Sequence, residues 1–143
     1  MYIKQLSVYL ENTKGQLAEI MKIIADQAID IRALSLADTT SFGILRLILD
    51  KPNEAKTALA AAGYPVAVTP VIAIGVADTP GSLSKAIEIL SNNDISIEYM
   101  YAFVAKQTNQ AVSILRVDDG DKAVDVLQNA CISFFGEVDM DNI

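Results

Sequence analysis

The feature that most constrains the fold of this chain is an internal repeat. The segment Asp78-Thr79-Pro80-Gly81-Ser82-Leu83 follows an apolar, strand-like run and opens an amphipathic, helix-like run. An earlier segment, Asn12-Thr13-Lys14-Gly15-Gln16-Leu17, has Thr, Gly and Leu at the same relative places, each 66 residues earlier (79 − 13, 81 − 15 and 83 − 17). A constant separation of this kind indicates one structural unit written twice.

Both copies show the same order of expected elements. Apolar residues recur with period two where we expect strands, and at i, i+3, i+4 and i+7 where we expect helices. In the first copy, the order strand, helix, strand, strand, helix, strand is expected over residues 3–10, 17–28, 29–34, 44–49, 55–62 and 64–69. In the second copy, the same order is expected over residues 71–77, 83–90, 95–104, 111–117, 123–130 and 132–135.

This order of elements predicts the fold class. With right-handed crossovers, it gives an antiparallel four-stranded sheet with both helices on one face, the ferredoxin-like arrangement. We therefore expect an α+β protein with two βαββαβ units in tandem, at residues 1–69 and 70–143. Because only Thr69-Pro70 joins them, we expect direct packing of the units rather than a flexible linker. Edge strands need protection, so sheets are expected to pair side by side, within the chain or across a homodimer.

Composition and charge exclude several classes of function. The formal net charge of −7 disfavours nucleic acid as a partner, because such binding depends on Lys and Arg neutralising phosphates. It equally disfavours an anionic membrane surface. The chain has no histidine, the commonest metal ligand and general base, and its single cysteine, Cys131, allows no internal disulfide. No apolar run reaches the roughly 20 residues that span a bilayer. We expect a cytoplasmic, non-catalytic protein without a metal or cofactor.

The repeated loop and its surroundings resemble a known family. The chain is similar to a tandem pair of ACT domains, small amino-acid-sensing modules attached to many biosynthetic enzymes. The resemblance covers essentially all 143 residues, and its specific part is the loop Asp78 to Leu83 with the following helix and Ile95-Ser96-Ile97. It implies ligand binding at the loop after the first strand, often where two such domains meet, and a regulatory, allosteric readout.

The resemblance also implies which residues bind the ligand. In the second copy these residues belong to the loop and to the adjoining strand: Asp78, Thr79, Pro80, Gly81, Ser82, Leu83 and Ser96. In the first copy they are Asn12, Thr13, Gly15, Gln16 and Leu17. The first copy departs from the family pattern because Lys14 stands where Pro80 stands, and Asn12 replaces Asp78. We therefore favour the second copy as the ligand site.

The chemistry of the second loop supports the same site on physical grounds. If Pro80 is the first helical residue and Thr79 the N-cap, backbone N–H groups of the first turn are free to bind a carboxylate. Asp78 would then bind an ammonium group, which gives a zwitterionic amino acid two partners. The structural alternative is that these residues only start a helix. In the first copy, Thr13 and Gln16 have the spacing of a capping box, which favours that alternative.

Other residue types of interest have simpler structural interpretations. Arg46 and Arg116 stand at equivalent places and could clamp a carboxylate, but a solvent-facing or interface role is commoner. Tyr99, Tyr101 and Phe103 alternate on one strand and fit either a pocket or an interface. The cluster Asp118, Asp119 and Asp121 lacks a full calcium-loop ligand set and is expected to start a helix, and Cys131 is expected to be buried and inert.

The function that we expect is therefore that of a non-catalytic regulatory protein. It would bind a free amino acid or similar small ligand at the loop after the first strand of each unit, with a second copy of the chain and a regulated enzyme as further partners. The alternative is a structural or protein-interaction module without a small ligand. A small enzyme is the least supported class, because the residues of the common catalytic sites are missing.

Overall fold

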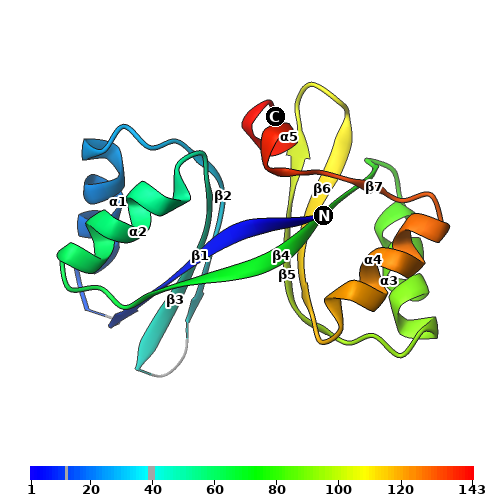
Figure 1. Ribbon diagram of the computed structural model, residues 1–143, viewed down its shortest axis with the longest axis horizontal. Helices are drawn as coiled ribbons and strands as arrows, with labels where there is room; N and C mark the ends of the chain where they lie inside the picture. The colour runs from blue at the N-terminus through cyan, green and yellow to red at the C-terminus, as the bar shows by residue number, and fades with distance from the viewer. Residues whose placement is uncertain (12, 39–40) are drawn as a thin grey trace. The chain divides into compact units, whose positions relative to one another are not determined.

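The computed structural model describes residues 1–11, 13–38 and 41–143 (Figure 1). These residues cluster into two compact units, which we call the N-terminal unit (Lys4–Thr69) and the C-terminal unit (Met1–Ile3 with Pro70–Ile143). The described residues form β1 (Tyr2–Glu11), α1 (Gln16–Asp26), β2 (Ile31–Asp38), β3 (Phe42–Leu49), α2 (Pro52–Ala61), β4 (Val66–Ala77), α3 (Ser82–Asn92), β5 (Ile97–Ala105), β6 (Gln110–Val117), α4 (Gly120–Asn129), β7 (Ser133–Phe134) and α5 (Glu137–Asp141).

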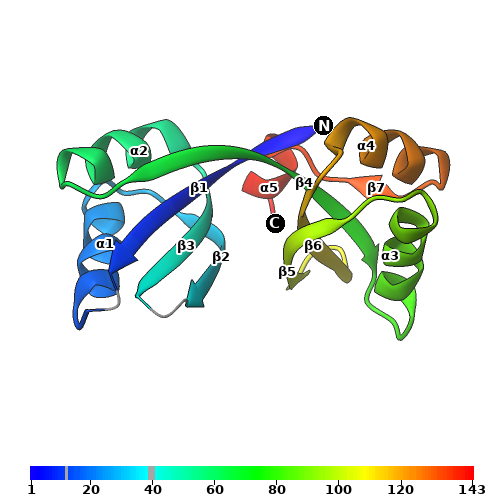
Figure 2. The same ribbon diagram turned by 90° about the horizontal axis from the view of Figure 1, so that it is seen from below.

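In the N-terminal unit, α1 and α2 cover one face of an antiparallel sheet (Figure 2). Strand β3 pairs with β1 on one side and with β2 on the other. Alternate residues of β1 and residues four apart on α1 face each other, as their periods of 2 and 3.6 require. They form a core of Leu6, Val8, Leu10, Ile20, Ile24, Ile29, Leu45, Leu47, Leu49, Ala55 and Leu59.

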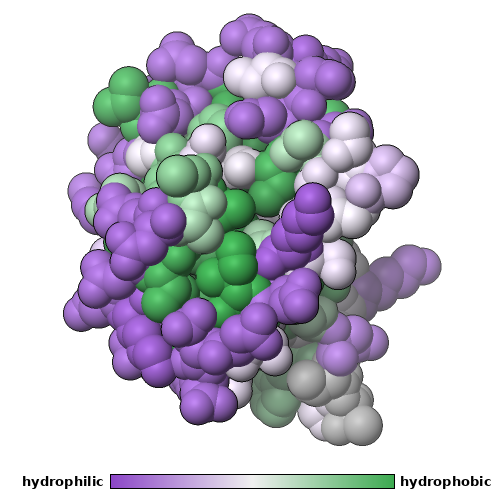
Figure 3. Space-filling model, turned by 90° about the vertical axis from the view of Figure 1, so that its right-hand side faces the viewer, coloured by the Kyte–Doolittle hydropathy of each residue, from purple (hydrophilic) through white to green (hydrophobic). Residues whose placement is uncertain are grey.

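The C-terminal unit repeats this arrangement with strand order β5-β6-β4-β7, all antiparallel. Helices α3 and α4 cover one face, and Figure 2 shows α5 on the side of the sheet away from them. Figure 3 faces the α3 and α4 layer, where an apolar strip is bordered by hydrophilic residues. The core consists of Ile72, Ile74, Val76, Ala86, Leu90, Ile95, Leu115, Val117, Ala123 and Leu127. The predicted α+β fold, two βαββαβ units with antiparallel sheets, is confirmed.

Strand β4 differs from the sequence prediction of two separate strands at 64–69 and 71–77. It is one continuous strand of 12 residues, Val66–Ala77, with Pro70 inside it. The fixed φ of proline is compatible with extended backbone, so Pro70 does not break the strand. Its carbonyl oxygen accepts a hydrogen bond from Arg116 Nη1 at 3.1 Å. The same strand therefore supplies residues to both units, Val66–Thr69 to one and Pro70–Ala77 to the other.

Candidate functional site

The loops after the first strands of the two units have the same backbone hydrogen bonds. In the C-terminal unit, Thr79 N–H donates to Ala77 O at 2.8 Å, and Ser82 N–H donates to Thr79 O at 3.3 Å. The bonds 66 residues earlier are Thr13 to Glu11 at 2.7 Å and Gln16 to Thr13 at 3.4 Å. The repeat in sequence is therefore a repeat in backbone structure.

The start of α3 corrects the predicted geometry of the loop. Helix α3 begins at Ser82 rather than at Pro80, and Gly81 occupies the N-cap position with φ +87°. Gly15 precedes α1 in the same way, with φ +93°. This left-handed conformation favours glycine because it has no Cβ. The predicted N-cap, Thr79, is wrong, and the Ser82 N–H group is already bonded to Thr79 O, so it is not free for a carboxylate.

The predicted capping box of the first loop is also wrong. Helix α1 has no side-chain cap, and Gln16 Oε1 instead accepts a hydrogen bond from Glu11 N–H at 2.9 Å. Gln16 thus ties the first turn of the helix to the last residue of β1, while Thr13 and Leu17 flank it. Asn12, which the resemblance placed in this site, lies outside the described residues.

Ser96 lies far from the other candidate residues of its unit. Gln110 pairs with both Ala77 and Ala105, whereas Val117 pairs with Ile97. Gln110 and Val117 are seven residues apart on β6 (117 − 110), which is roughly 23 Å at about 3.3 Å per residue. Ser96 therefore lies at the opposite end of the sheet, where its N–H donates to Asp118 Oδ1 at 3.0 Å. The structure does not bring it to the loop of its own unit.

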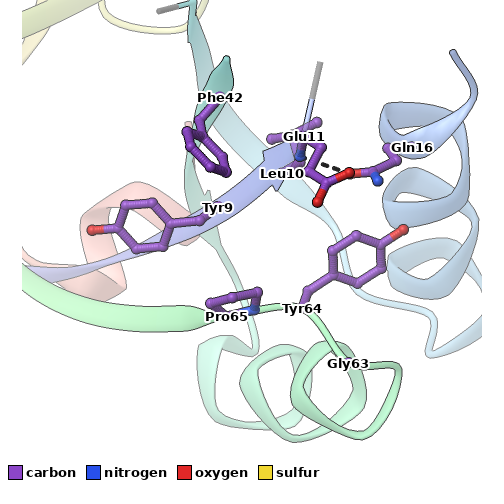
Figure 4. A pocket seen from close by; sticks show the side chains of 8 residues that line it. All are labelled: Tyr9, Leu10, Glu11, Gln16, Phe42, Gly63, Tyr64 and Pro65. Atoms are coloured by element: carbon purple, nitrogen blue, oxygen red, sulfur yellow. Dashed lines mark hydrogen bonds between the residues drawn. The ribbon is translucent and has the colours of Figure 1, made fainter. Parts of the chain in front are cut away.

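A pocket borders the loop in each unit. The pocket in the N-terminal unit, which we call the N pocket, has a volume of about 340 Å³ and is lined by Tyr9, Leu10, Glu11, Gln16, Phe42, Gly63, Tyr64 and Pro65 (Figure 4). The pocket in the C-terminal unit, the C pocket, has a volume of about 290 Å³ and is lined by Gly75, Val76, Ala77, Ser82, Lys85, Gln110, Cys131, Ile132 and Ser133. Each pocket thus lies between the end of the first strand, the first helix and the segment after the second helix.

The two pockets are equivalent parts of the repeat. Tyr9, Glu11 and Gln16 in one correspond to Gly75, Ala77 and Ser82 in the other, 66 residues later. The far walls also match, because the second residue after each of α2 and α4 is left-handed, Gly63 with φ +92° and Cys131 with φ +60°. Each donates its N–H to a carbonyl of the last helical turn, Ala60 O at 3.0 Å and Gln128 O at 2.9 Å.

Sequence reasoning missed the far wall of both pockets. The wall residues, at 63–65 and 131–133, follow the second helix of each unit and are brought to the loop only by tertiary structure. Gly63 gave a local signal as a helix-ending glycine, whereas nothing in the sequence marked Cys131. The prediction that Cys131 is buried is wrong: it is exposed, because it occupies the left-handed helix end and lines the C pocket.

The N pocket combines aromatic rings with carboxylates. Burial, together with the hydrogen bond that its hydroxyl group donates to Glu19, raises the pKa of the Tyr64 phenol. Figure 4 shows the Glu11 carboxylate and the Tyr64 ring turned toward each other near the start of α1, with Tyr9 and Phe42 on the other side. The lining therefore offers aromatic rings and the negative charge of Glu11 to a ligand.

The other candidate residues have structural partners. Arg116 Nη1 bonds to Pro70 O, and its Nε lies 3.4 Å from Glu98 Oε2. Asp119 is the N-cap of α4 and accepts a hydrogen bond from Lys122 N–H at 3.1 Å, which supports the interpretation of the acidic cluster as a helix start. Among the described residues, no group of three or more His, Cys, Asp or Glu is placed to hold a metal ion. Likewise, no helix in this part of the chain is long and apolar enough to cross a membrane.

Comparison with known proteins gives the family. A family model of the ACT domain pair matches residues 1–143. The chain belongs to the ACT domain pair family. The resemblance inferred from the repeated loop is thereby confirmed over the whole chain.

Solved structures agree with this assignment. Protein BT0572 from Bacteroides thetaiotaomicron is 35% identical, with a TM-score of 0.93, and the match covers 100% of this chain and 98% of that one. The ligand-free regulatory subunit of aspartate kinase from Thermus thermophilus is 17% identical, with a TM-score of 0.62 over 89% of this chain and 91% of that one. The aspartate kinase of Clostridium acetobutylicum is 15% identical, with a TM-score of 0.55 over 89% of this chain and 32% of that one. The last two matches show the shared fold. No curated protein matched the chain in sequence.

Proposed function

We propose that this ACT domain pair is a non-catalytic regulatory protein that binds a free amino acid or similar small ligand beside the loop after the first strand of each unit. The observation that carries the proposal is the pocket bordering each loop at equivalent positions. Volumes of about 340 and 290 Å³ suit a small ligand, since ligand pockets usually start at roughly 300 Å³. The fold shared with a regulatory subunit and with an allosteric aspartate kinase supports a regulatory role.

The proposed ligand contacts come from the loops and from the pocket walls. In the C-terminal unit we propose the loop residues Asp78, Thr79, Pro80, Gly81, Ser82 and Leu83, of which Ser82 lines the pocket, with Lys85 and Gln110 from its wall. In the N-terminal unit we propose the loop residues Asn12, Thr13, Gly15, Gln16 and Leu17, of which Gln16 lines the pocket, with Glu11 and Tyr64 from its wall. Ser96 is not part of a site in its own unit, because it lies at the other end of the sheet.

A ligand in such a pocket would act through the elements that it joins. It would connect the first helix of the unit to the segment between the second helix and the last strand. Regulation requires that the ligand bind one arrangement of these elements more tightly than another, which typically supplies about 1–3 kcal/mol of coupling. The chain would transmit this free energy to a partner, for which a regulated enzyme is our proposal.

A second candidate function is protein interaction without a small ligand. Strand β2 is an edge strand whose Leu34 and Leu36 side chains are 50% and 49% exposed. Edge strands with exposed apolar residues pair readily with another strand, which favours a homodimer formed along β2. A homodimer is compatible with ligand binding, so this candidate replaces the first only if no small ligand binds.

The test is a thermal-shift and calorimetry screen of the full chain with the common amino acids. A ligand at 100 times its Kd raises the free energy of unfolding by about 2.7 kcal/mol, which gives a measurable rise in Tm. Ala77→Phe places a ring in the C pocket at an exposed strand position and should abolish binding there. Ala102→Phe, at an exposed position of β5, is the matched control and should bind normally. The proposal fails if no amino acid shifts Tm.

A further inference from the structure

We infer that the N pocket selects an organic ammonium ion, whereas the C pocket, at the equivalent position, does not. This inference deepens the proposed function and rests on it. The inference depends on how the lining side chains differ between the N pocket and the C pocket, which have equivalent backbone structures. The shared backbone means that the difference in selectivity comes from the side chains alone.

The first difference between the pockets is charge. Glu11 lines the N pocket, and Glu19 binds the hydroxyl group of its Tyr64. The residues at the same places in the second copy are Ala77 and Lys85. Two carboxylates in the first copy therefore correspond to one ammonium group in the second, and like charge repels a cation from the C pocket.

The Glu11 carboxylate is available to a ligand in the N pocket. Within the described residues, no Lys or Arg forms an ion pair with Glu11 or Glu19. Among the described residues, Glu11 is the charged residue that lines the N pocket and Lys85 the one that lines the C pocket. Lys14, Glu19 and Asp78 do not line either pocket. Charge on the pocket walls is thus negative in the N pocket and positive in the C pocket.

The second difference is the aromatic lining. Tyr9, Phe42 and Tyr64 line the N pocket, and a cation over such ring faces is attracted by their quadrupoles. Residues lining the C pocket, as far as the structure describes them, include no aromatic side chain; Ile132 stands in place of Tyr64. The N pocket therefore offers an ammonium group two kinds of attraction that the C pocket lacks.

The hydrogen bonds around the N pocket hold this lining in place. The Tyr64 hydroxyl donates to Glu19, which fixes the ring at the pocket wall. Gln16 Oε1 accepts from the Glu11 backbone N–H at 2.9 Å, which ties the first turn of α1 to the residue that carries the carboxylate. Because both contacts form without a ligand, little ordering of side chains is left for the binding step, and this favours affinity.

The experiment is a two-dimensional amide NMR titration of the full chain with three probes of one shape: benzylammonium, benzyl alcohol and benzoate. We expect benzylammonium to bind at least tenfold more tightly than the other two, with the largest shifts at Glu11, Gln16 and Tyr64. Glu11→Gln should weaken its binding about fivefold, as expected for loss of one partly exposed ion pair. Glu88→Gln, on the exposed face of α3, is the matched control and should leave affinity unchanged.

Three results would overturn the inference: equal affinity for the three probes, benzylammonium shifts centred on Lys85 and Cys131, or equal losses in Glu11→Gln and Glu88→Gln. These outcomes are separable from failure of the proposed function. If amino acids bind beside the loops while the probes show no preference for positive charge, only the charge selectivity is wrong. If no amino acid binds in either pocket, the proposed function itself is wrong.

Discussion

The N-terminal and C-terminal units share the backbone structure of the loop and of the pocket beside it. They differ in the side chains that line the pocket. Their loops share donors, acceptors and a left-handed glycine, Gly15 in one and Gly81 in the other. Their pockets differ in charge and in aromatic content. The repeat therefore constrains the backbone, because the loop hydrogen bonds and φ angles leave few choices, while side chains that face a pocket are free to diverge.

The largest expected effect tests whether the two loop glycines are equivalent. Gly15→Val and Gly81→Val each place a β-branched residue at positive φ, although an added Cβ would meet nothing within 4 Å. We expect each to lower the free energy of unfolding by a similar amount, about 1–3 kcal/mol, from backbone strain alone. Urea unfolding measures both. Losses of the free energy of unfolding that differ by more than twofold between the two variants would contradict the equivalence of the loops.

A second variant tests a place where the units differ in packing. A Cβ at Gly75 would collide with the ring of Phe135. The backbone of Phe135 is held in place because its N–H group donates to Ala73 O at 2.9 Å. Gly75→Ala should therefore cost about 1–2 kcal/mol through overpacking. At the equivalent position in the N-terminal unit, Tyr9→Ala should cost less than about 1 kcal/mol because Tyr9 is exposed. Thermal unfolding of both variants checks the contrast, and equal losses would contradict it.

Substitutions at the left-handed residues after α2 and α4 should change the free energy of unfolding by smaller amounts and in opposite directions. Cys131 holds the left-handed conformation that glycine holds at Gly63. Cys131→Gly should raise the free energy of unfolding by about 0.5 kcal/mol, the relief of strain exceeding the added freedom of the unfolded chain. Gly63→Ala should lower it by about 1 kcal/mol. Chemical denaturation that shows both variants destabilised would mean that the Cys131 thiol makes contacts worth more than the strain.

The smallest expected effect is the change of stability with pH that comes from two tyrosines whose hydroxyl groups donate to carboxylates. A hydrogen bond to Asp121 Oδ1 at 2.5 Å, helped by burial, raises the pKa of Tyr2 in the C-terminal unit to about 12 from 10.0. Since the folded pKa lies above the unfolded one, the stabilisation is complete below pH 10.0 and is lost as pH rises through about 12. Tyr64 shifts in the same direction for a related cause.

Tyrosinate absorbance over an alkaline titration measures these shifts. Tyr2→Phe should remove the phenol that titrates near pH 12 and cost less than about 1 kcal/mol at neutral pH, because the pair is partly exposed. A titration in which the wild-type and Tyr2→Phe proteins differ only in amplitude near pH 10.0 would show that the Asp121 bond does not form in solution.

Most of the fold could be predicted from the sequence because it is set by local periodicity. The apolar spacing of 17, 20, 21 and 24 predicted α1, and alternation at 6, 8 and 10 predicted β1; both face the core. The continuity of β4 through Pro70 could not be predicted, because proline favours a break or an edge in isolation and only its neighbours show otherwise. Helix α5 carries too short a pattern to be detected.

The candidate site was predicted only in part. The two loops could be located from sequence because Gly81 and its repeat Gly15 mark a special backbone conformation, and of the predicted loop residues Gln16 and Ser82 line the pockets. The helix start was wrong because Pro80 favours the first helical position, whereas the left-handed glycine delays the helix to Ser82. The pocket walls after α2 and α4 depend on contacts between segments about 50 residues apart, which no local pattern records.

The central claim is that the two equivalent pockets are ligand sites, and amide NMR of the full chain with free amino acids tests it most directly. The account predicts that a binding amino acid shifts resonances on both walls of a pocket together, Gln16 with Tyr64 or Ser82 with Cys131. The absence of shifts with every amino acid, or shifts confined to the β2 edge around Leu34 and Leu36, would contradict it.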